Sequence, residues 1–120
     1  YCFEHFKIRS GRGTGWHQFG GLSSPILCWF AAYHRPGTFT CGFDVWIEEQ
    51  SFTDENSQLE VRLKYYGQPG RKFDVIACMN AKKKYRAVWN EEEVKCEELI
   101  MGVLQISLSG SINEGVLRVY

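Results

Sequence analysis

The chain has 120 residues, of which 44 % are hydrophobic and 15 % aromatic, and its 14 basic and 14 acidic residues give a formal net charge of zero. This composition excludes a disordered chain, and the length fits one domain built on one core. The absence of net charge argues against nucleic acid or an anionic membrane surface as a partner, and it leaves self-association into a homo-oligomer open. No apolar run approaches the roughly 18 residues that a membrane-spanning segment needs.

The first residues predict a strand followed by a glycine-rich loop. Cys2 to Ile8 has the composition of a short extended segment, and five glycines then occur between Gly11 and Gly21. Glycine in a helix costs about 1 kcal/mol relative to alanine, so a loop is expected there. The glycine spacing matches neither a dinucleotide-binding fingerprint nor a P-loop, which excludes both phosphate-binding motifs.

Within this loop, Trp16, His17 and Gln18 form a candidate ligand-binding group. An indole face stacks on a sugar ring, while the imidazole and the amide hydrogen-bond hydroxyl groups, and a pocket needs this combination of apolar surface and oriented polar groups. In the alternative interpretation, Trp16 only anchors the loop by packing.

A helix is predicted from Ser23 to His34. The serines at its start can cap the helix, and Pro25 suits the first helical turn. Apolar residues then surround the helix, which is typical of a helix buried between two layers. Arg35-Pro36-Gly37 ends it, so the sequence predicts a loop and helix segment over residues 1–37 and a second segment over residues 38–120.

From Thr38 to Tyr120 the apolar residues alternate with a period of two, which is typical of strands. The stretch from Thr38 to Glu49 is predicted to form a single strand, and the residues on its apolar face are Phe39, Cys41, Phe43, Val45 and Ile47. The other expected strands cover 59–66, 73–79, 85–89, 103–108 and 116–120, with a short one around 94–96, and turns are expected at 53–57, 67–70 and 90–93. This pattern predicts a mostly-β fold, an antiparallel β-sandwich of jelly-roll or Ig-like type with one N-terminal helix, in which both segments form one structural unit.

The reactive and metal-binding side chains of the sequence do not form a recognisable catalytic or metal-binding motif. Five cysteines, an odd number without a Cys-x-x-Cys pair, predict free thiols, with one disulfide as the alternative. The three histidines have no ligand spacing, so no metal site and no cofactor are expected. The carboxylates do not form a pair around a cleft, as glycoside cleavage requires. The cysteines are Cys2, Cys28, Cys41, Cys78 and Cys96, and the histidines are His5, His17 and His34.

Two further groups are candidates for contact with a partner. Lys82, Lys83, Lys84 and Arg86 cluster at a predicted hairpin, where a solvated tip is favoured over an anion site. A second group, of Trp46, Tyr66 and Trp89, would form an exposed aromatic platform if all three side chains faced solvent.

Several short stretches of the chain resemble the C-terminal region of glycoside hydrolases that have an (α/α)6 barrel followed by a β-sandwich. The similar stretches are Gly13-Thr-Gly-Trp-His-Gln-Phe-Gly-Gly-Leu-Ser-Ser-Pro25, Trp29-Phe-Ala-Ala-Tyr33, Arg35-Pro36-Gly37, 74–79, 85–90, 102–108 and 115–120. The resemblance implies the last barrel helix plus the appended sandwich, with Trp16, His17 and Gln18 facing the sugar cleft. A barrel needs about a dozen helices and this chain has room for one, so a fragment of a longer protein is expected.

The expected function is therefore that of an accessory C-terminal β-sandwich of a carbohydrate-active enzyme, which supports or contacts a saccharide site. Its partners would be a saccharide or a catalytic domain, and 120 residues alone are not expected to be catalytic. The alternatives are a stand-alone module that binds a glycan or a protein, and an assembly protein that forms oligomers through edge strands. The sequence indicates no cellular compartment.

Overall fold

The computed structural model describes residues 3–7, 9, 13–17, 35–81, 83–110 and 113–120. The chain divides into two units, Tyr1–Ala32 and Tyr33–Tyr120, whereas the predicted division was at residue 37. The helix predicted from Ser23 to His34 lies outside the described residues, and the expectation that both segments form one structural unit stays a prediction. Within the described part of the chain, no helix has the length and apolar character needed to cross a membrane.

The first unit contains a two-stranded antiparallel sheet. Strand β1, Phe3–Phe6, confirms the predicted first strand, and β2 covers Gly13–His17. Phe3 pairs with His17 and Phe6 with Gly13, with an irregularity in register between them. The prediction of a continuous glycine-rich loop is therefore wrong for Gly13–His17. Pairing with β1 provides hydrogen-bond partners for the backbone groups of these residues. The low strand propensity of glycine does not include this stabilisation by a neighbouring strand.

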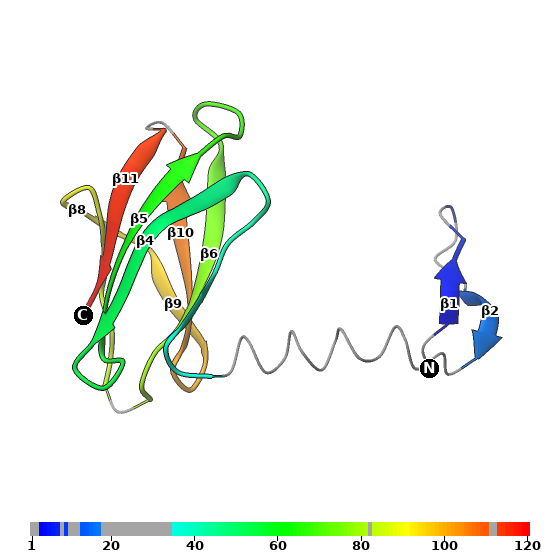
Figure 1. Cartoon of the computed structure of the whole chain (residues 1–120), viewed down its shortest axis with the longest axis horizontal. Helices are drawn as coiled ribbons and strands as arrows, with labels where there is room; N and C mark the ends of the chain where they lie inside the picture. Colours follow the sequence, from blue (N-terminus) through cyan, green and yellow to red (C-terminus); the bar gives the residue numbers. More distant parts are fainter. Residues whose placement is uncertain (1–2, 8, 10–12, 18–34, 82, 111–112) are drawn as a thin grey trace. The chain divides into compact units, whose positions relative to one another are not determined.

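The second unit consists of two antiparallel sheets (Figure 1). Its strands are β3 Thr38–Thr40, β4 Val45–Thr53, β5 Gln58–Tyr65, β6 Lys72–Cys78, β7 Ala87–Trp89, β8 Glu92–Val94, β9 Cys96–Ile100, β10 Val103–Ser109 and β11 Glu114–Val119. Sheet I has the strand order β3-β6-β10-β9, and sheet II has the order β4-β5-β11-β7-β8. All these neighbours pair antiparallel. The mostly-β, antiparallel prediction is confirmed.

One core lies between the two sheets. Its members alternate along the strands, so that every second residue points inward and the residue between points outward. The alternation predicted for β5 is confirmed, because Leu59, Val61, Leu63 and Tyr65 are all buried. Sheet I contributes Phe39, Val75, Ala77, Leu104, Ile106 and Leu108 to the same cluster, and sheet II adds Val45, Ala87, Trp89, Leu117 and Val119.

The single strand predicted from Thr38 to Glu49 is wrong. Strand β3 ends at Thr40 in sheet I, and β4 begins at Val45 in sheet II, so the chain crosses from one sheet to the other between them. The Gly42 carbonyl accepts a hydrogen bond from the Val45 amide at 3.2 Å, which closes a tight turn. Phe43 lies in this turn and is fully exposed instead of facing the core.

The region after β7 also differs from the expectation. The predicted turn at 90–93 is shorter, because Glu92 already belongs to β8, and Asn90 and Glu91 hold the turn with φ values of 47° and 73°. The short strand expected around 94–96 is instead the junction of two strands, because β8 ends at Val94. Strand β9 runs from Cys96 to Ile100, most of which was not expected to form a strand. Most of its residues are exposed and it lies at the edge of sheet I, so its sequence lacks the apolar alternation of a covered strand.

A matched pair of leucine variants tests the position of the core. Leu63→Ala removes a side chain with no exposed surface, and we expect it to lower the free energy of unfolding by about 2–5 kcal/mol. The same change at Leu99, which is half exposed on β9, should stay within about 0.5 kcal/mol of the parent. Urea denaturation followed by circular dichroism measures both, and equal losses would contradict the described core.

Candidate functional site

The predicted ligand-binding group is only partly described by the structure. Trp16 and His17 lie in β2, where the backbone of His17 pairs with that of Phe3. Gln18 lies outside the described residues. A saccharide contact by Trp16, His17 and Gln18 therefore stays a prediction.

A group of exposed aromatic side chains lies at one end of sheet II. Trp46 on β4 is 64 % exposed, and Tyr66, directly after β5, is 69 % exposed. The Tyr66 amide donates to the Asp44 carbonyl at 2.8 Å, which extends the β4–β5 pairing and places Tyr66 two residues beyond Lys64, the partner of Trp46. We call Phe43, Trp46 and Tyr66 the aromatic end. Trp89, the third member of the predicted platform, is instead buried in the core.

Lys64 is the centre of the polar groups beside the aromatic end. The strand register aligns Trp46 on β4, Lys64 on β5 and Glu114 on β11 in one row across the outer face of sheet II. Lys64 Nζ lies 3.5 Å from Glu48 Oε1 and 4.0 Å from Glu114 Oε2. Glu48 raises the pKa of Lys64 most, followed by Tyr66 and Glu114, which keeps the ammonium group charged.

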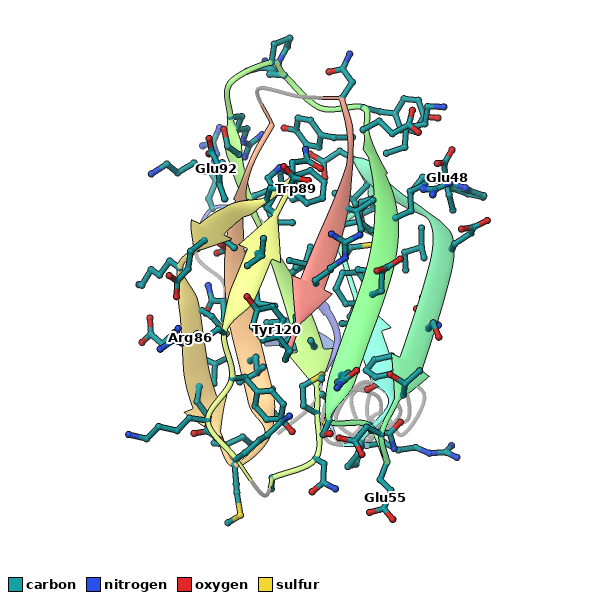
Figure 2. All side chains as sticks on the ribbon, turned by 90° about the vertical axis from the view of Figure 1, so that its left-hand side faces the viewer. Glu48, Glu55, Arg86, Trp89, Glu92 and Tyr120 are labelled. Atoms are coloured by element: carbon teal, nitrogen blue, oxygen red, sulfur yellow. The ribbon has the colours of Figure 1, made fainter. Side chains whose placement is uncertain are left out.

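A β-bulge on β4 places Glu48 beside Lys64. Ile47 pairs with Leu63 and Glu49 with Arg62, so Glu48 is an extra residue that no residue of β5 opposes. A bulge bends the strand and redirects its side chains. As Figure 2 shows, Glu48 projects outward from β4. The bulge thereby brings a second carboxylate to Lys64 from an edge strand.

A separate groove of about 480 Å³ lies where β8, β10 and the first residue of β6 approach one another. Trp89 and Glu92, which are labelled in Figure 2, belong to its lining. Trp89 offers little surface to a ligand because it is only 6 % exposed. The groove also carries charges of both signs, and Lys95 Nζ is paired with Glu97 Oε2 at 2.8 Å. Its other lining residues are Lys72, Asn90, Val94, Ser107, Leu108 and Ser109.

The described cysteines are free thiols. Cys41, Cys78 and Cys96 form no disulfide, and burial raises the pKa of each thiol, so all three stay protonated at neutral pH. A protonated thiol is a poor nucleophile, which argues against cysteine catalysis by these residues. Cys2 and Cys28 lie outside the described residues. In the described ranges, no three His, Cys, Asp or Glu side chains are gathered so that they could hold a metal ion.

The predicted basic group is solvent-exposed where the structure describes it. Lys83, Lys84 and Arg86 are exposed, and Lys82 lies outside the described residues. Lys83 Nζ lies 5.6 Å from the centre of the Tyr85 ring, which is a cation–π distance. This arrangement accounts for Lys83 without an anionic ligand.

The alignment of Trp46, Lys64 and Glu114 in one row was not predicted from the sequence. The alternation of β5 indicates that Lys64 faces outward, but the residues beside it come from strands 18 and 50 positions away, as the differences 64 − 46 and 114 − 64 show. Strand register across such separations is not visible in one sequence. The bulge at Glu48 had a signal, because the inward apolar positions change from odd (Val45, Ile47) to even (Phe52) along β4.

No family model matches this chain, and neither the curated proteins nor the solved structures contain a significant match to it.

Removal of the carboxylates around Lys64 tests the geometry of the row. We expect Glu48→Gln to lower the pKa of Lys64 toward its ordinary value, and Glu114→Gln to lower it less, because Glu114 contributes less to the shift and lies farther away. Since the folded-state pKa is raised, the stabilisation from these contacts is present at neutral pH and is lost as the pH rises through that pKa. NMR titration of the Lys64 side chain measures the effect.

Glu60→Gln is the matched control for this titration. Glu60 lies on β5 like Lys64 but pairs with Arg118, with 2.8 Å between Glu60 Oε2 and Arg118 Nε. The Lys64 pKa should not change in this variant. A Lys64 pKa that is equal in the parent and in all three variants would show that the row is not formed in solution.

Proposed function

We propose that the second unit is an accessory β-sandwich of a carbohydrate-active enzyme and that it contacts saccharide through the outer face of sheet II. One observation carries this proposal: Trp46 and Tyr66 are exposed beside Lys64, and two carboxylates hold the ammonium group of that lysine. The role is binding and support, and the reaction belongs to a catalytic domain.

The chemistry of this surface suits a sugar ring. Aromatic rings offer flat apolar faces with a large contact area, on which the C–H groups of a sugar pack. The Lys64 ammonium group is a donor with three hydrogens, and the carboxylates of Glu48 and Glu114 are acceptors, so vicinal hydroxyl groups find both kinds of partner. These carboxylates lie on an open sheet face and do not flank a cleft, which favours binding over glycoside cleavage.

Of the two predicted sandwich topologies, we favour a jelly roll. Strand β5 pairs with β11, and β6 pairs with β10, so early strands of the chain pair with late strands in a nested order. Each nested pair lies in a different sheet, as in a long hairpin that is rolled up into two layers.

The resemblance of a few sequence stretches to the C-terminal region of (α/α)6-barrel glycoside hydrolases is the reason for proposing the accessory role. In this proposal the predicted helix from Ser23 to His34 belongs to the catalytic domain, and Trp16, His17 and Gln18 face its saccharide. The partners are then a saccharide and a catalytic domain. Oligomer formation through sheet edges is the weaker expectation, because the bulge at Glu48 interrupts the regular edge of β4.

The alternative is a stand-alone module that binds a glycan or a protein. The β9–β10 hairpin favours contact with a protein surface, because Leu99, Ile100 and Met101 at its tip are half or more exposed. Exposed apolar side chains that are adjacent to one another mark interaction surfaces.

Substitution of the aromatic end tests the proposed function. We expect the chain to bind at least one linear glycan on an array, and Trp46→Ala or Tyr66→Ala to weaken that binding about 30-fold or more, as the loss of a central aromatic contact does. Isothermal titration calorimetry with the best glycan measures the dissociation constants.

Met101→Ala is the control for this experiment. Met101 is 78 % exposed and lies on the β9–β10 hairpin of sheet I, so its removal should leave glycan binding unchanged. If a folded parent chain bound no glycan, the saccharide function would be wrong. Equal weakening by Met101→Ala and Trp46→Ala would place the glycan elsewhere.

A further inference from the structure

We propose that the outer face of sheet II is an extended binding site for a linear, uncharged oligosaccharide, which runs from Trp46 and Tyr66 to Tyr120. This inference rests on the proposed function and adds to it the length and charge of the ligand. The observations behind it concern the outward-facing residues of β4, β5 and β11 that lie beyond the aromatic end.

The first observation is that outward-facing side chains form successive rows across β4, β5 and β11, starting from the aromatic end. Beyond the row of Lys64, the register aligns Glu49, Arg62 and Val116, and then Ser51, Glu60 and Arg118. The outer face of three adjacent strands therefore presents polar side chains in successive rows, interrupted at Val116. These rows supply donors and acceptors at regular intervals along the strands.

The second support is the shape of this face. Two open depressions of about 300 Å³ each lie on it, one after the other along the strands. Ser51 and Glu60 line both, so the depressions adjoin. The first also contains Glu49, Gln50, Arg62 and Val116, and the second contains Thr53, Gln58, Leu59, Arg118, Val119 and Tyr120.

The third support is an aromatic residue at each end. Tyr120 is half exposed and lines the second depression, and Figure 2 shows it just beyond the tip of β11. Two backbone hydrogen bonds with Arg86, of 3.0 and 3.1 Å, hold Tyr120 in place. Because Val119 pairs with Leu59, Tyr120 lies beside Gln58.

The length of the face selects the size of the ligand. From Lys64 to Gln58 the strand advances six residues, as 64 − 58 shows, which corresponds to roughly 20 Å. A single sugar ring reaches only one end of such a face. A chain of several sugar residues is needed to contact both Trp46 and Tyr120.

The charges of the face select an uncharged ligand. The basic and acidic groups are matched within the surface: Lys64 lies near Glu48 and Glu114, Arg62 Nη1 is 3.8 Å from Glu49 Oε2, and Arg118 is paired with Glu60. Three basic groups against four acidic groups leave no positive potential for an anionic polysaccharide. The neutral hydroxyl groups of a sugar can hydrogen-bond to these charged side chains without breaking the ion pairs between them.

The test compares two chain lengths. Cellobiose and cellohexaose, xylobiose and xylohexaose, and mannobiose and mannohexaose are titrated calorimetrically against the full chain, with maltohexaose as a curved chain. We expect one straight hexasaccharide to bind about tenfold or more tightly than its disaccharide, because it contacts both ends of the face. Tyr120→Ala should weaken the hexasaccharide to nearly the affinity of the disaccharide and leave the disaccharide unchanged.

The variants separate this inference from the proposed function. Trp46→Ala should weaken both lengths, whereas Met101→Ala, outside sheet II, should change neither. Disaccharide and hexasaccharide affinities that are equal, with both sensitive to Trp46→Ala, would overturn the extended site and leave the proposed function standing. A folded parent chain that binds no probe of either length would overturn both, and tighter binding of maltohexaose than of every straight hexasaccharide would contradict an extended ligand.

Discussion

The burial of one face of β5 is the constraint on which the rest of the second unit depends. Leu59, Val61, Leu63 and Tyr65 are inside the core, so the residues between them must face solvent. A shift of one residue in this strand would exchange the two faces and expose four core side chains. The apolar alternation therefore fixes the outward direction of Lys64 and, through the pairing with β4 and β11, the position of the whole polar surface.

The bulge at Glu48 serves two purposes at the same edge. Strand β4 is nine residues long and lies at the end of sheet II, and a long regular edge is open to pairing with another chain. The extra residue breaks that regularity and places acidic side chains on the edge. It also brings Glu48 to Lys64, so one irregularity both protects the edge and completes the polar group beside Trp46.

The sequence predicted the strands whose alternation is uninterrupted and failed where the chain changes direction or sheet. Strand β5 was predicted nearly to the residue because its inward positions are all apolar. The alternation of Phe39, Cys41, Phe43 and Val45 was equally regular, yet it spans the turn at Gly42 that carries the chain from sheet I to sheet II. A period of two does not distinguish one strand from two strands joined by a short crossing, because both alternate. The expected exposure of Trp46 and Tyr66 was right and that of Trp89 was wrong, since the face of a three-residue strand is set by its neighbours and not by its own pattern.

The groove beside Trp89 is a weaker candidate for ligand binding than the aromatic end, although it is a larger cavity than the depressions on sheet II. The groove has the greater volume, but its indole is already packed in the core, where a Cβ on Gly115 would come within 2.5 Å of the ring. A ligand in the groove would gain little aromatic contact without displacing core atoms. At the aromatic end the rings of Trp46 and Tyr66 are exposed on a surface that the sheet already holds, so a ligand that stacks there displaces only water. Preformed exposure of the aromatic faces, rather than cavity volume, is therefore the reason for proposing the outer face of sheet II, and not the groove, as the binding surface.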